Sequence, residues 1–552
     1  MTDRKEAADK LVQKARTLLK RPPLPALASL AIPLYQQAIA LDPERLEIQL
    51  RLAKAYWSLG QSEQARSVCE QVLAQSPNTI AARLLHAVFQ FPMLYRDGSE
   101  VVASRTAYQN EIAALARDVA GDLSASCQLA AWADQIHPYY LPYQGLNDID
   151  LQRNYGDMMC GVMATAYPNH SRALPSPSEP GERLRIGIVS EHFYAHSNWQ
   201  AITGGWMEGL DPARFAIHAY SLSKREDECT AKARGLAAHF YSGERSFDEW
   251  RQAIVSDRLY ALIYPAVGTH SMVTKLAMLR LAPIQCLAAG HCTTSGFPTM
   301  DYFLSADLTE PPDAISHYSE TLVRLPGLGI RYARPLVSSP SRSRASFGLR
   351  PSACVFLSPN ALVKYLPQHD ALYPSIAAQL EDSQIVFVRH PRRDAISRQF
   401  EQRMRRAFAE HEVDWDRHVV FLPRLDRADY NDLQVHSDIY LDSIGWNGGN
   451  TTAIALGYDL PMVTLTGPVF RGRMGTAMLR LMGIEETIAA TPREYVEIAV
   501  RLGKDAEWRQ QLRRRIAQGK HRIYDDPDVA AGLAAFLENA IAMARPKHGG
   551  CN

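Results

Sequence analysis

Two series of short apolar segments, separated by helical or polar stretches, constrain the fold of this chain most. The first series comprises residues 184–190, 215–222, 259–266 and 284–290. The second comprises residues 354–360, 384–390, 418–424, 438–443 and 461–467. Short apolar runs of this kind, alternating with helical patterns, are typical of strands in an open parallel sheet. We therefore predict two consecutive doubly wound, Rossmann-like sheets.

The loops that follow these strands are the expected ligand site. In open parallel sheets, ligands bind outside the carboxyl ends of the strands. Two such sheets in succession predict a cleft between two lobes, and a layout of this kind favours a nucleotide-type ligand.

An internal repeat precedes the sheets. Residues 35–43 (YQQAIALDP) and 69–77 (CEQVLAQSP) align without gaps, and Pro43 and Pro77 lie one tetratricopeptide period apart. One full repeat and part of another are fewer than a free-standing array needs, because each helix pair buries its face against neighbours. We expect this α-helical region to pack on the chain that follows.

These patterns predict the domain boundaries. We expect tetratricopeptide-like repeats at 1–84, an intervening helical region at 85–170, a linker rich in Pro and Ser at 171–183, the first lobe at 184–340, the second lobe at 341–525, and a C-terminal helix and tail at 526–552.

Composition excludes several classes of protein. The chain has 60 basic and 59 acidic residues and no long basic run, which argues against a nucleic-acid partner. Its eight cysteines include no CxxC pair and predict free thiols in a reducing compartment. The most apolar early stretch is short and broken by Pro33, and the amino terminus lacks the apolar core of a signal peptide, so we expect a cytoplasmic protein without membrane insertion.

A polar, glycine-rich loop follows one predicted strand. Residues 439–442 form an apolar run that ends in an acid, and NGGNTT (447–452) comes shortly after it, before a helical pattern. Glycine permits close backbone approach, and the free N–H groups of a helix N-terminus bind anions. The alternative is an ordinary loop with a well-capped helix.

Several stretches together indicate a family. LRIGIVSEHFYAHS, LSPNALVKYLPQHD, DIYLDSIGWNGGNTT and LPMVTLTGPVFRGRMGTAMLRLMG, with others in the same order, span roughly residues 184 to 525. They resemble the O-linked N-acetylglucosamine transferases of glycosyltransferase family 41, most closely bacterial SPINDLY-like members with attached tetratricopeptide repeats.

The resemblance implies a GT-B fold and a metal-independent, inverting transfer of a sugar to a protein hydroxyl. The donor would be a UDP-sugar, most simply UDP-N-acetylglucosamine (UDP-GlcNAc), held mainly by the second lobe. No cofactor and no metal are expected. The acceptor would be a Ser or Thr hydroxyl of a protein or peptide, which the tetratricopeptide-like region could bind.

Specific residues take roles from this resemblance. Lys364 matches a phosphate-contacting lysine that can neutralise the departing diphosphate as a point charge; alternatively it is a solvated lysine at a helix start. His196 matches a first-lobe histidine that could take the proton of the acceptor hydroxyl or could only hydrogen-bond to the sugar or acceptor. The residues matched to the nucleotide sugar are Asn360, Leu425, Arg427, Asn447, Gly448, Gly449, Asn450, Thr451, Thr452, Gly467, Arg471 and Arg473. Those matched to the acceptor and sugar side are Gly290, His291, Thr294 and Ser295.

The chain also departs from the family pattern. Ala266, Ile454, Pro468 and Met474 stand where relatives often carry polar residues. Two further functions therefore stay open. One changes the donor or acceptor, as in O-fucosylation from GDP-fucose or glucosylation of Asn. The other is a catalytically weak scaffold that binds a nucleotide sugar.

Overall fold

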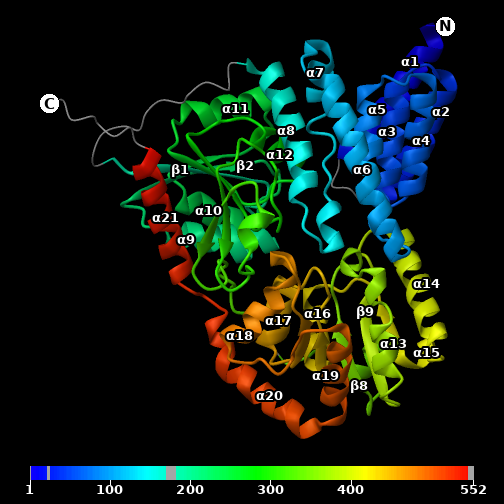
Figure 1. Cartoon of the computed structure of the whole chain (residues 1–552), viewed down its shortest axis with the longest axis vertical. Helices are drawn as coiled ribbons and strands as arrows, with labels where there is room; N and C mark the ends of the chain where they lie inside the picture. Colours follow the sequence, from blue (N-terminus) through cyan, green and yellow to red (C-terminus); the bar gives the residue numbers. More distant parts are fainter. Residues whose placement is uncertain (1, 21–24, 169–181, 338, 545–552) are drawn as a thin grey trace. The chain divides into compact units, whose positions relative to one another are not determined.

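The computed structural model describes residues 2–20, 25–168, 182–337 and 339–544 (Figure 1). The chain divides into two compact units: unit 1 is Met1–Trp132 with Ser339–Asp438, and unit 2 is Ala133–Ser338 with Ile439–Asn552. Each unit joins segments far apart in the sequence, whereas each predicted domain is one continuous range. The predicted domain boundaries therefore stay predictions. Most of the predicted linker, residues 171–181, and the tail from residue 545 lie outside the described residues.

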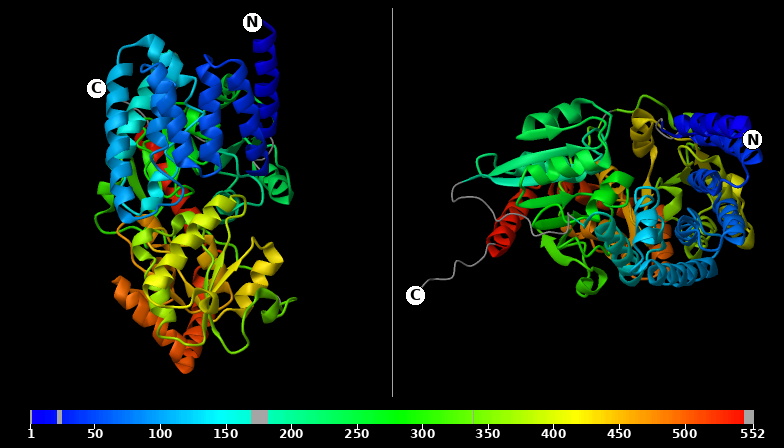
Figure 2. Two further views of the ribbon diagram at one scale, coloured as in Figure 1. Left: turned by 90° about the vertical axis from the view of Figure 1, so that its right-hand side faces the viewer. Right: turned by 90° about the horizontal axis from the view of Figure 1, so that it is seen from above.

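Unit 1 begins with helices that pack consecutively, from α1 on α2 to α5 on α6, as the blue ribbons of Figures 1 and 2 show. They are α1 (Thr2–Lys20), α2 (Pro25–Leu41), α3 (Leu46–Ser58), α4 (Ser62–Gln75), α5 (Ile80–Val88), α6 (Gly98–Val119) and α7 (Leu123–Ala130). Buried alanines such as Ala8 and Ala38 allow close approach in the core of the first helices. Pro43 and Pro77 follow the ends of α2 and α4, because proline cannot continue a helix.

The rest of unit 1 contains the parallel strands β8 (Cys354–Ser358), β9 (Ser383–Val388) and β10 (Val419–Leu422). Its helices are α13 (Leu372–Ala377), α14 (Asp394–Glu410), α15 (Trp415–His418) and α16 (Arg427–His436), with 3₁₀ turns η5 (Arg344–Phe347), η6 (Leu362–Lys364) and η7 (Pro367–His369). Tyr365, Phe387 and Phe400 form the aromatic centre of this part, with ring centroids 5.2 to 5.6 Å apart.

Unit 2 contains a seven-stranded parallel sheet with the order β3-β2-β1-β4-β5-β6-β7. The strands are β1 (Leu184–Ser190), β2 (Phe215–Ser221), β3 (His239–Tyr241), β4 (Ala261–Tyr264), β5 (Ile284–Ala288), β6 (Tyr302–Ala306) and β7 (Thr321–Leu325). In the register of β1 with β2, Leu184 pairs with Phe215 and Ser190 with Ser221. The change of direction in the strand order falls at β1 and β4, which is where a doubly wound sheet binds its ligands.

Helices flank this sheet. They are α8 (Ile149–Ala166), the π-helical turn η3 (Trp199–Thr203), α9 (Gly204–Gly209), α10 (Glu228–Leu236), α11 (Phe247–Ser256), α12 (Ser271–Ala277) and α21 (Asp528–Ala544), with 3₁₀ turns η1 (Leu141–Gln144) and η4 (Ala314–His317). The last helix, α21, packs on β5, β7 and α9. The predicted C-terminal helix therefore belongs with the first sheet.

Unit 2 also contains the parallel strands β11 (Ile439–Leu441), β12 (Met462–Leu465) and β13 (Ile488–Ala489), in this order. They are accompanied by α17 (Asn450–Gly457), η8 (Phe470–Gly472), α18 (Met474–Leu481), α19 (Pro492–Lys504), α20 (Ala506–Gly519) and η9 (Lys520–Arg522).

The two predicted parallel sheets are confirmed, since every predicted apolar run overlaps a strand. The sequence analysis missed β3, β6, β7 and β13. Strands β3 and β13 have three and two residues, too few for an apolar pattern. Strand β7 mixes Thr and Arg with Leu and Val and is only partly buried. Within the described part of the chain, no helix has the length and apolar character needed to span a membrane.

Candidate functional site

The polar loop after β11 is anchored by a buried carboxylate. Asp442, at the end of this strand, has no exposed surface. Its Oδ1 accepts the Gly448 N–H at 2.8 Å, and its Oδ2 accepts the Thr464 hydroxyl at 3.0 Å. The sequence analysis noted an acid at this strand end but assigned it no role. Asp442 fixes the start of the loop against the sheet.

Gly448 is required by close packing in this loop. A Cβ at this position would lie 2.3 Å from Thr451 Oγ1, 2.5 Å from Thr452 Oγ1 and 2.6 Å from the Tyr440 hydroxyl. These hydroxyls bond to one another: Thr452 donates to Tyr440 at 3.3 Å, and Tyr440 donates to Thr451 at 3.2 Å. The Thr452 hydroxyl is therefore occupied inside the loop.

Helix α17 begins directly after this cluster. Its N-cap is Gly449, which has no side chain to cap the first turn. The first N–H groups of a helix have no partner within the helix. Asn450 and Thr451, both partly exposed, are the first two residues of α17, and the N-terminus of a helix can bind an anion through its backbone. No side-chain hydrogen bond caps this end of α17.

The loop after β12 closes against the first one. The Asn447 N–H donates to the Arg471 carbonyl at 2.7 Å, and the Gly467 N–H donates to the Gly472 carbonyl at 2.7 Å. Arg473 is half-buried, and its Nη1 donates to the Gly467 carbonyl at 3.1 Å, while its buried Nε has no partner among the described residues. Arg473 therefore retains a donor for a ligand.

Arg471 was expected to contact the nucleotide sugar, but its guanidinium contacts groups within the protein. Its side chain is 4% exposed, and its guanidinium bonds to the carbonyls of Pro142 (Nε, 2.6 Å) and Leu146 and pairs with Asp148 at 2.7 Å. Asp148 is itself fully buried. These contacts hold the 142–148 segment in place, so we interpret Arg471 as a positioning residue and not as a ligand contact.

Two stacked histidines follow β1. The rings of His192 and His196 lie 3.7 Å apart at an angle of 4°. Burial lowers the pKa of His192 to about 3 and that of His196 to about 4, so both rings are neutral at pH 7. Nδ1 of His196 accepts the Asn198 N–H at 3.2 Å. In a neutral ring the other nitrogen then carries the proton, so Nε2 of His196 is a hydrogen-bond donor. This geometry favours the hydrogen-bonding role of His196 over the proton-accepting one.

A buried acid that the sequence analysis missed lies beside these rings. Glu191 is 7% exposed; its Oε1 accepts the Thr269 hydroxyl at 2.8 Å, and its Oε2 has no partner among the described residues. Burial raises the pKa of Glu191 to about 7. Like Asp442, it stands at a strand end, which is the signal that could have identified it.

The raised pKa of Glu191 gives a pH-dependent stability. The pKa of Glu191 in the folded protein exceeds the ordinary value of 4.5. The stability that the neutral carboxyl contributes to the fold is therefore fully present below pH 4.5 and is lost as the pH rises through about 7. The loss reaches about 1.4 kcal/mol per pH unit in this window. In urea titrations at pH 5, 6, 7 and 8, we expect the free energy of unfolding of wild type relative to Glu191→Gln to fall up to pH 7 and then to level. A difference that is independent of pH would contradict the raised pKa.

The residues expected on the acceptor side lie between β5 and β6. His291 is 3% exposed and stacks on Tyr139 with centroids 5.0 Å apart, and burial lowers its pKa to about 3. Thr294 and Ser295 are buried and both donate hydroxyls to Glu320. Gly290 donates its N–H to the Pro265 carbonyl at 2.9 Å. These contacts fix the conformation of the loop. Nε2 of His291 is buried and has no hydrogen-bond partner among the described residues.

Unit 1 holds the remaining expected residues. Asn360 is buried, and Lys364 is half-buried at the end of η6, after β8. Leu425 and Arg427 follow β10. The carboxyl ends of parallel strands share one edge, so these residues gather at one edge of the unit 1 strands.

Two of the departures from the family pattern are packed in the interior. Ala266 is 2% and Met474 4% exposed, whereas Pro468 is exposed and Ile454 half-buried. Among the described residues, no three His, Cys, Asp or Glu side chains gather as a metal site.

Comparison with known proteins identifies the family. The model of glycosyl transferase family 41 matches residues 162–328 and 336–524. The chain belongs to this family. A tetratricopeptide repeat model matches residues 28–88, which confirms the predicted repeats.

Relatives in family 41 are similar to part of the chain. The probable UDP-N-acetylglucosamine–peptide N-acetylglucosaminyltransferase SPINDLY of Arabidopsis thaliana is 26% identical over 65% of this chain and 40% of its own length. The UDP-N-acetylglucosamine–peptide N-acetylglucosaminyltransferase of Caenorhabditis elegans is 30% identical over 61% of this chain and 38% of its own. The chain thus matches about two fifths of the length of these relatives.

A solved structure matches nearly the whole chain. A lysine-to-methionine variant of Thermobaculum terrenum O-GlcNAc transferase superposes with a TM-score of 0.69 and 20% identity, covering 99% of this chain and 98% of that one. This likeness confirms the fold expected for family 41: a helical repeat region followed by the two Rossmann-like lobes of a GT-B fold.

Proposed function

We propose that this protein is a metal-independent, inverting glycosyltransferase that transfers GlcNAc from UDP-GlcNAc to Ser or Thr hydroxyls of protein acceptors. The observation that carries the proposal is the β11–α17 loop, in which Asp442 fixes Gly448 close to the N-terminus of α17, an end without a side-chain cap at which a diphosphate can bind. Membership of family 41 supports the reaction class.

In the proposed reaction, the acceptor hydroxyl oxygen bonds to the anomeric carbon as the bond from that carbon to the β-phosphate oxygen breaks. The electron pair leaves with the diphosphate, and the hydroxyl proton leaves with a base. Backbone N–H groups of Asn450 and Thr451, the half-buried Arg473 and the ammonium of Lys364 would stabilise the departing charge. His196, with Nε2–H as donor, would orient the sugar or a phosphate oxygen.

Other proposed contacts complete the donor site. Asn360, Leu425 and Arg427 would surround the uracil and ribose, and Gly448, Gly449 and Gly467 would leave room for the ligand. His291 would line the sugar side. The thiols that the structure describes form no disulfide, which supports a cytoplasmic location.

We also propose that the tetratricopeptide-like region binds the protein acceptor. Helices α2, α3 and α4 line a groove of about 450 Å³ whose side chains include Gln36, Gln49, Gln71 and Gln75. Amide side chains can donate to and accept from a peptide backbone at once. Leu52 and Val68 add apolar surface to the same groove.

One experiment tests the proposed function against its alternatives. Purified protein is treated with EDTA, incubated with UDP-GlcNAc, UDP-glucose or GDP-fucose, and analysed by intact mass and by release of nucleoside diphosphate. We expect turnover with UDP-GlcNAc and a higher melting temperature with UDP, because a ligand that binds only the folded state stabilises it. Faster turnover with UDP-glucose or GDP-fucose than with UDP-GlcNAc would assign a different donor substrate. Binding without turnover would favour a nucleotide-sugar scaffold, which the apolar Ala266 and Met474 suggest. No response to any nucleotide would refute the proposal.

A further inference from the structure

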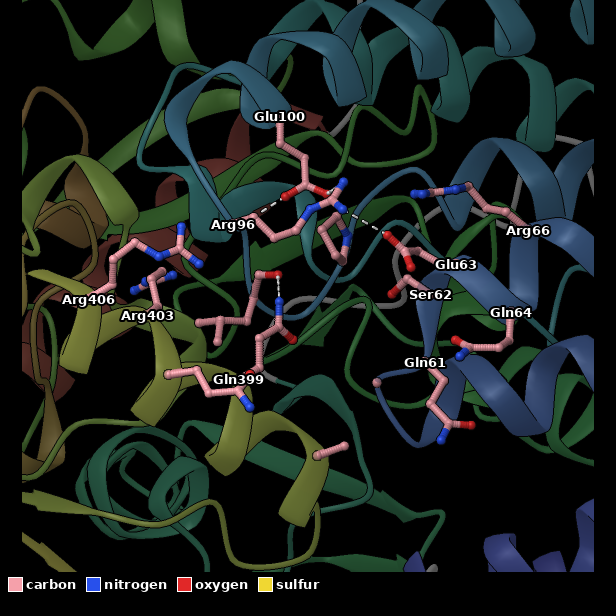
Figure 3. Close-up of a pocket in the computed structure, with 15 residues that line it drawn as sticks. Gln61, Ser62, Glu63, Gln64, Arg66, Arg96, Glu100, Gln399, Arg403 and Arg406 are labelled. Atoms are coloured by element: carbon pink, nitrogen blue, oxygen red, sulfur yellow. Dashed lines mark hydrogen bonds and ion pairs between the residues drawn. The ribbon is translucent and has the colours of Figure 1, made fainter.

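A second cavity, of about 450 Å³, lies wholly within unit 1 (Figure 3). It is formed by the start of α4, by the segment from Pro92 to Glu100 and by one face of α14. None of the residues expected to bind the nucleotide sugar lines it. Its lining contains four arginines and two glutamates. We call it the α4–α14 cavity.

The walls of the α4–α14 cavity are fixed by specific contacts. Arg393 Nε donates to the Ser58 carbonyl at 2.7 Å, and Arg403 Nη1 donates to the Tyr95 carbonyl at 2.7 Å. Gly60 has a φ of +82°, and a Cβ there would lie 2.5 Å from Ile396 Cδ1. The repeat helices therefore pack closely on α14, and these contacts hold the walls of the cavity in place.

The cavity is lined by hydrogen-bond donors at the start of α4. Helix α4 has 14 residues, and its N-cap, Gln61, makes no side-chain capping bond. The N–H groups of its first turn have no intrahelical acceptor. Ser62, the first residue of α4, is 6% exposed, and its hydroxyl has no hydrogen-bond partner in the described part of the chain. A buried hydroxyl without a partner is unfavourable, so an acceptor placed here would be bound favourably.

The charges around the cavity favour an anion. Arg96 bridges the two glutamates, Glu63 at 3.0 Å and Glu100 at 3.4 Å, and thereby offsets their repulsion. Arg66 and Arg406 line the cavity and form no ion pair with any described residue. In Figure 3 they extend from opposite sides of the view, with Arg96 and Ser62 between them. Arg66 Nη1 donates to the Phe89 carbonyl at 3.5 Å, and Arg406 is attracted by the Asp370 carboxylate, which pairs with Arg403. Both guanidinium groups keep further N–H donors for a ligand.

We propose that the α4–α14 cavity binds the phosphate group of a small phosphorylated molecule, separately from the donor site. Phosphate oxygens can accept from the Ser62 hydroxyl and the first N–H groups of α4 together, and guanidinium groups bind phosphate in a bidentate manner. The volume of about 450 Å³ is that of a small-molecule site.

Calorimetry with inorganic pyrophosphate tests this site. The protein with all 552 residues of the sequence is first saturated with UDP, so that any donor site is filled, and pyrophosphate is then titrated. We expect one binding event, weakened about tenfold by Arg66→Gln or Arg406→Gln, since each removes about 1.4 kcal/mol of a charge-assisted contact. Arg398→Gln is the matched control, because Arg398 is an exposed residue of α14 outside the cavity. Absence of binding, or equal weakening by Arg398→Gln, would overturn the proposal.

Ser62→Ala separates a ligand contact from a structural role. Because the hydroxyl has no partner among the residues that the structure describes, we expect the ligand-free melting temperature to stay unchanged or to rise, while the shift caused by pyrophosphate becomes smaller. A lower ligand-free melting temperature with an unchanged shift would refute the role of Ser62. ATP in a parallel titration distinguishes a nucleotide ligand from an inorganic one. The readouts do not use transferase activity, so the site and the proposed function can fail independently.

Discussion

Replacement of Lys364 by Met should lower the proposed glycosyl transfer rate about a hundredfold, which is roughly 3 kcal/mol of transition-state stabilisation. The bond from the sugar to the β-phosphate leaves negative charge on the diphosphate, and no metal is invoked to neutralise it. Lys364 is half-buried after β8, so its ammonium is less screened than that of a surface lysine. The measurement is kcat with UDP-GlcNAc and a protein acceptor.

Two controls make this prediction specific. Lys364→Arg keeps the positive charge and should restore part of the rate, because the charge and not the ammonium shape carries most of the effect. Lys504→Met removes a lysine exposed at the end of α19 and should leave kcat unchanged. If Lys364→Met stays within threefold of wild type while the transferase is active, the assigned role of Lys364 is wrong.

Replacement of Arg471 by Met should destabilise the fold by about 3–5 kcal/mol. The change leaves the carboxylate of Asp148, which has no exposed surface, without its partner at 2.7 Å, and it also removes the Arg471 donor from the carbonyls of Pro142 and Leu146. The free energy of unfolding in urea is the quantity to measure.

The same experiment separates a positioning role from ligand binding. Combining Arg471→Met with Asp148→Asn should recover part of the loss, because the uncompensated buried charge is then absent. Arg493→Met breaks an exposed ion pair with Glu497 and should cost less than about 1 kcal/mol. A small stability loss for Arg471→Met together with much weaker UDP binding would show that Arg471 contacts the ligand after all.

Most features that depend on residues close together in the chain were predicted correctly, and features that depend on distant contacts were not. Repeats and buried strands were predictable because they depend on local periodicity: α2 to α5 and the main strands lie where apolar spacing placed them. The glycine-rich loop before α17 was recognisable because glycine, Asn and Thr have local conformational preferences. Glu191 and Asp442 were not assigned, since a single acid at a strand end has no periodic signal.

The sequence by itself determined the order of the longer strands and the repeat helices, the family and the loop that precedes α17. Only the tertiary structure decided which polar groups are free. Arg471 is held by Asp148, the Thr452 hydroxyl bonds to Tyr440, and the Ser62 hydroxyl has no partner among the described residues. The physical reason is that secondary structure follows from interactions between residues close in sequence. The burial of a side chain, its hydrogen-bond and ion-pair partners and its pKa depend on which distant segments pack together. No local sequence pattern specifies that packing.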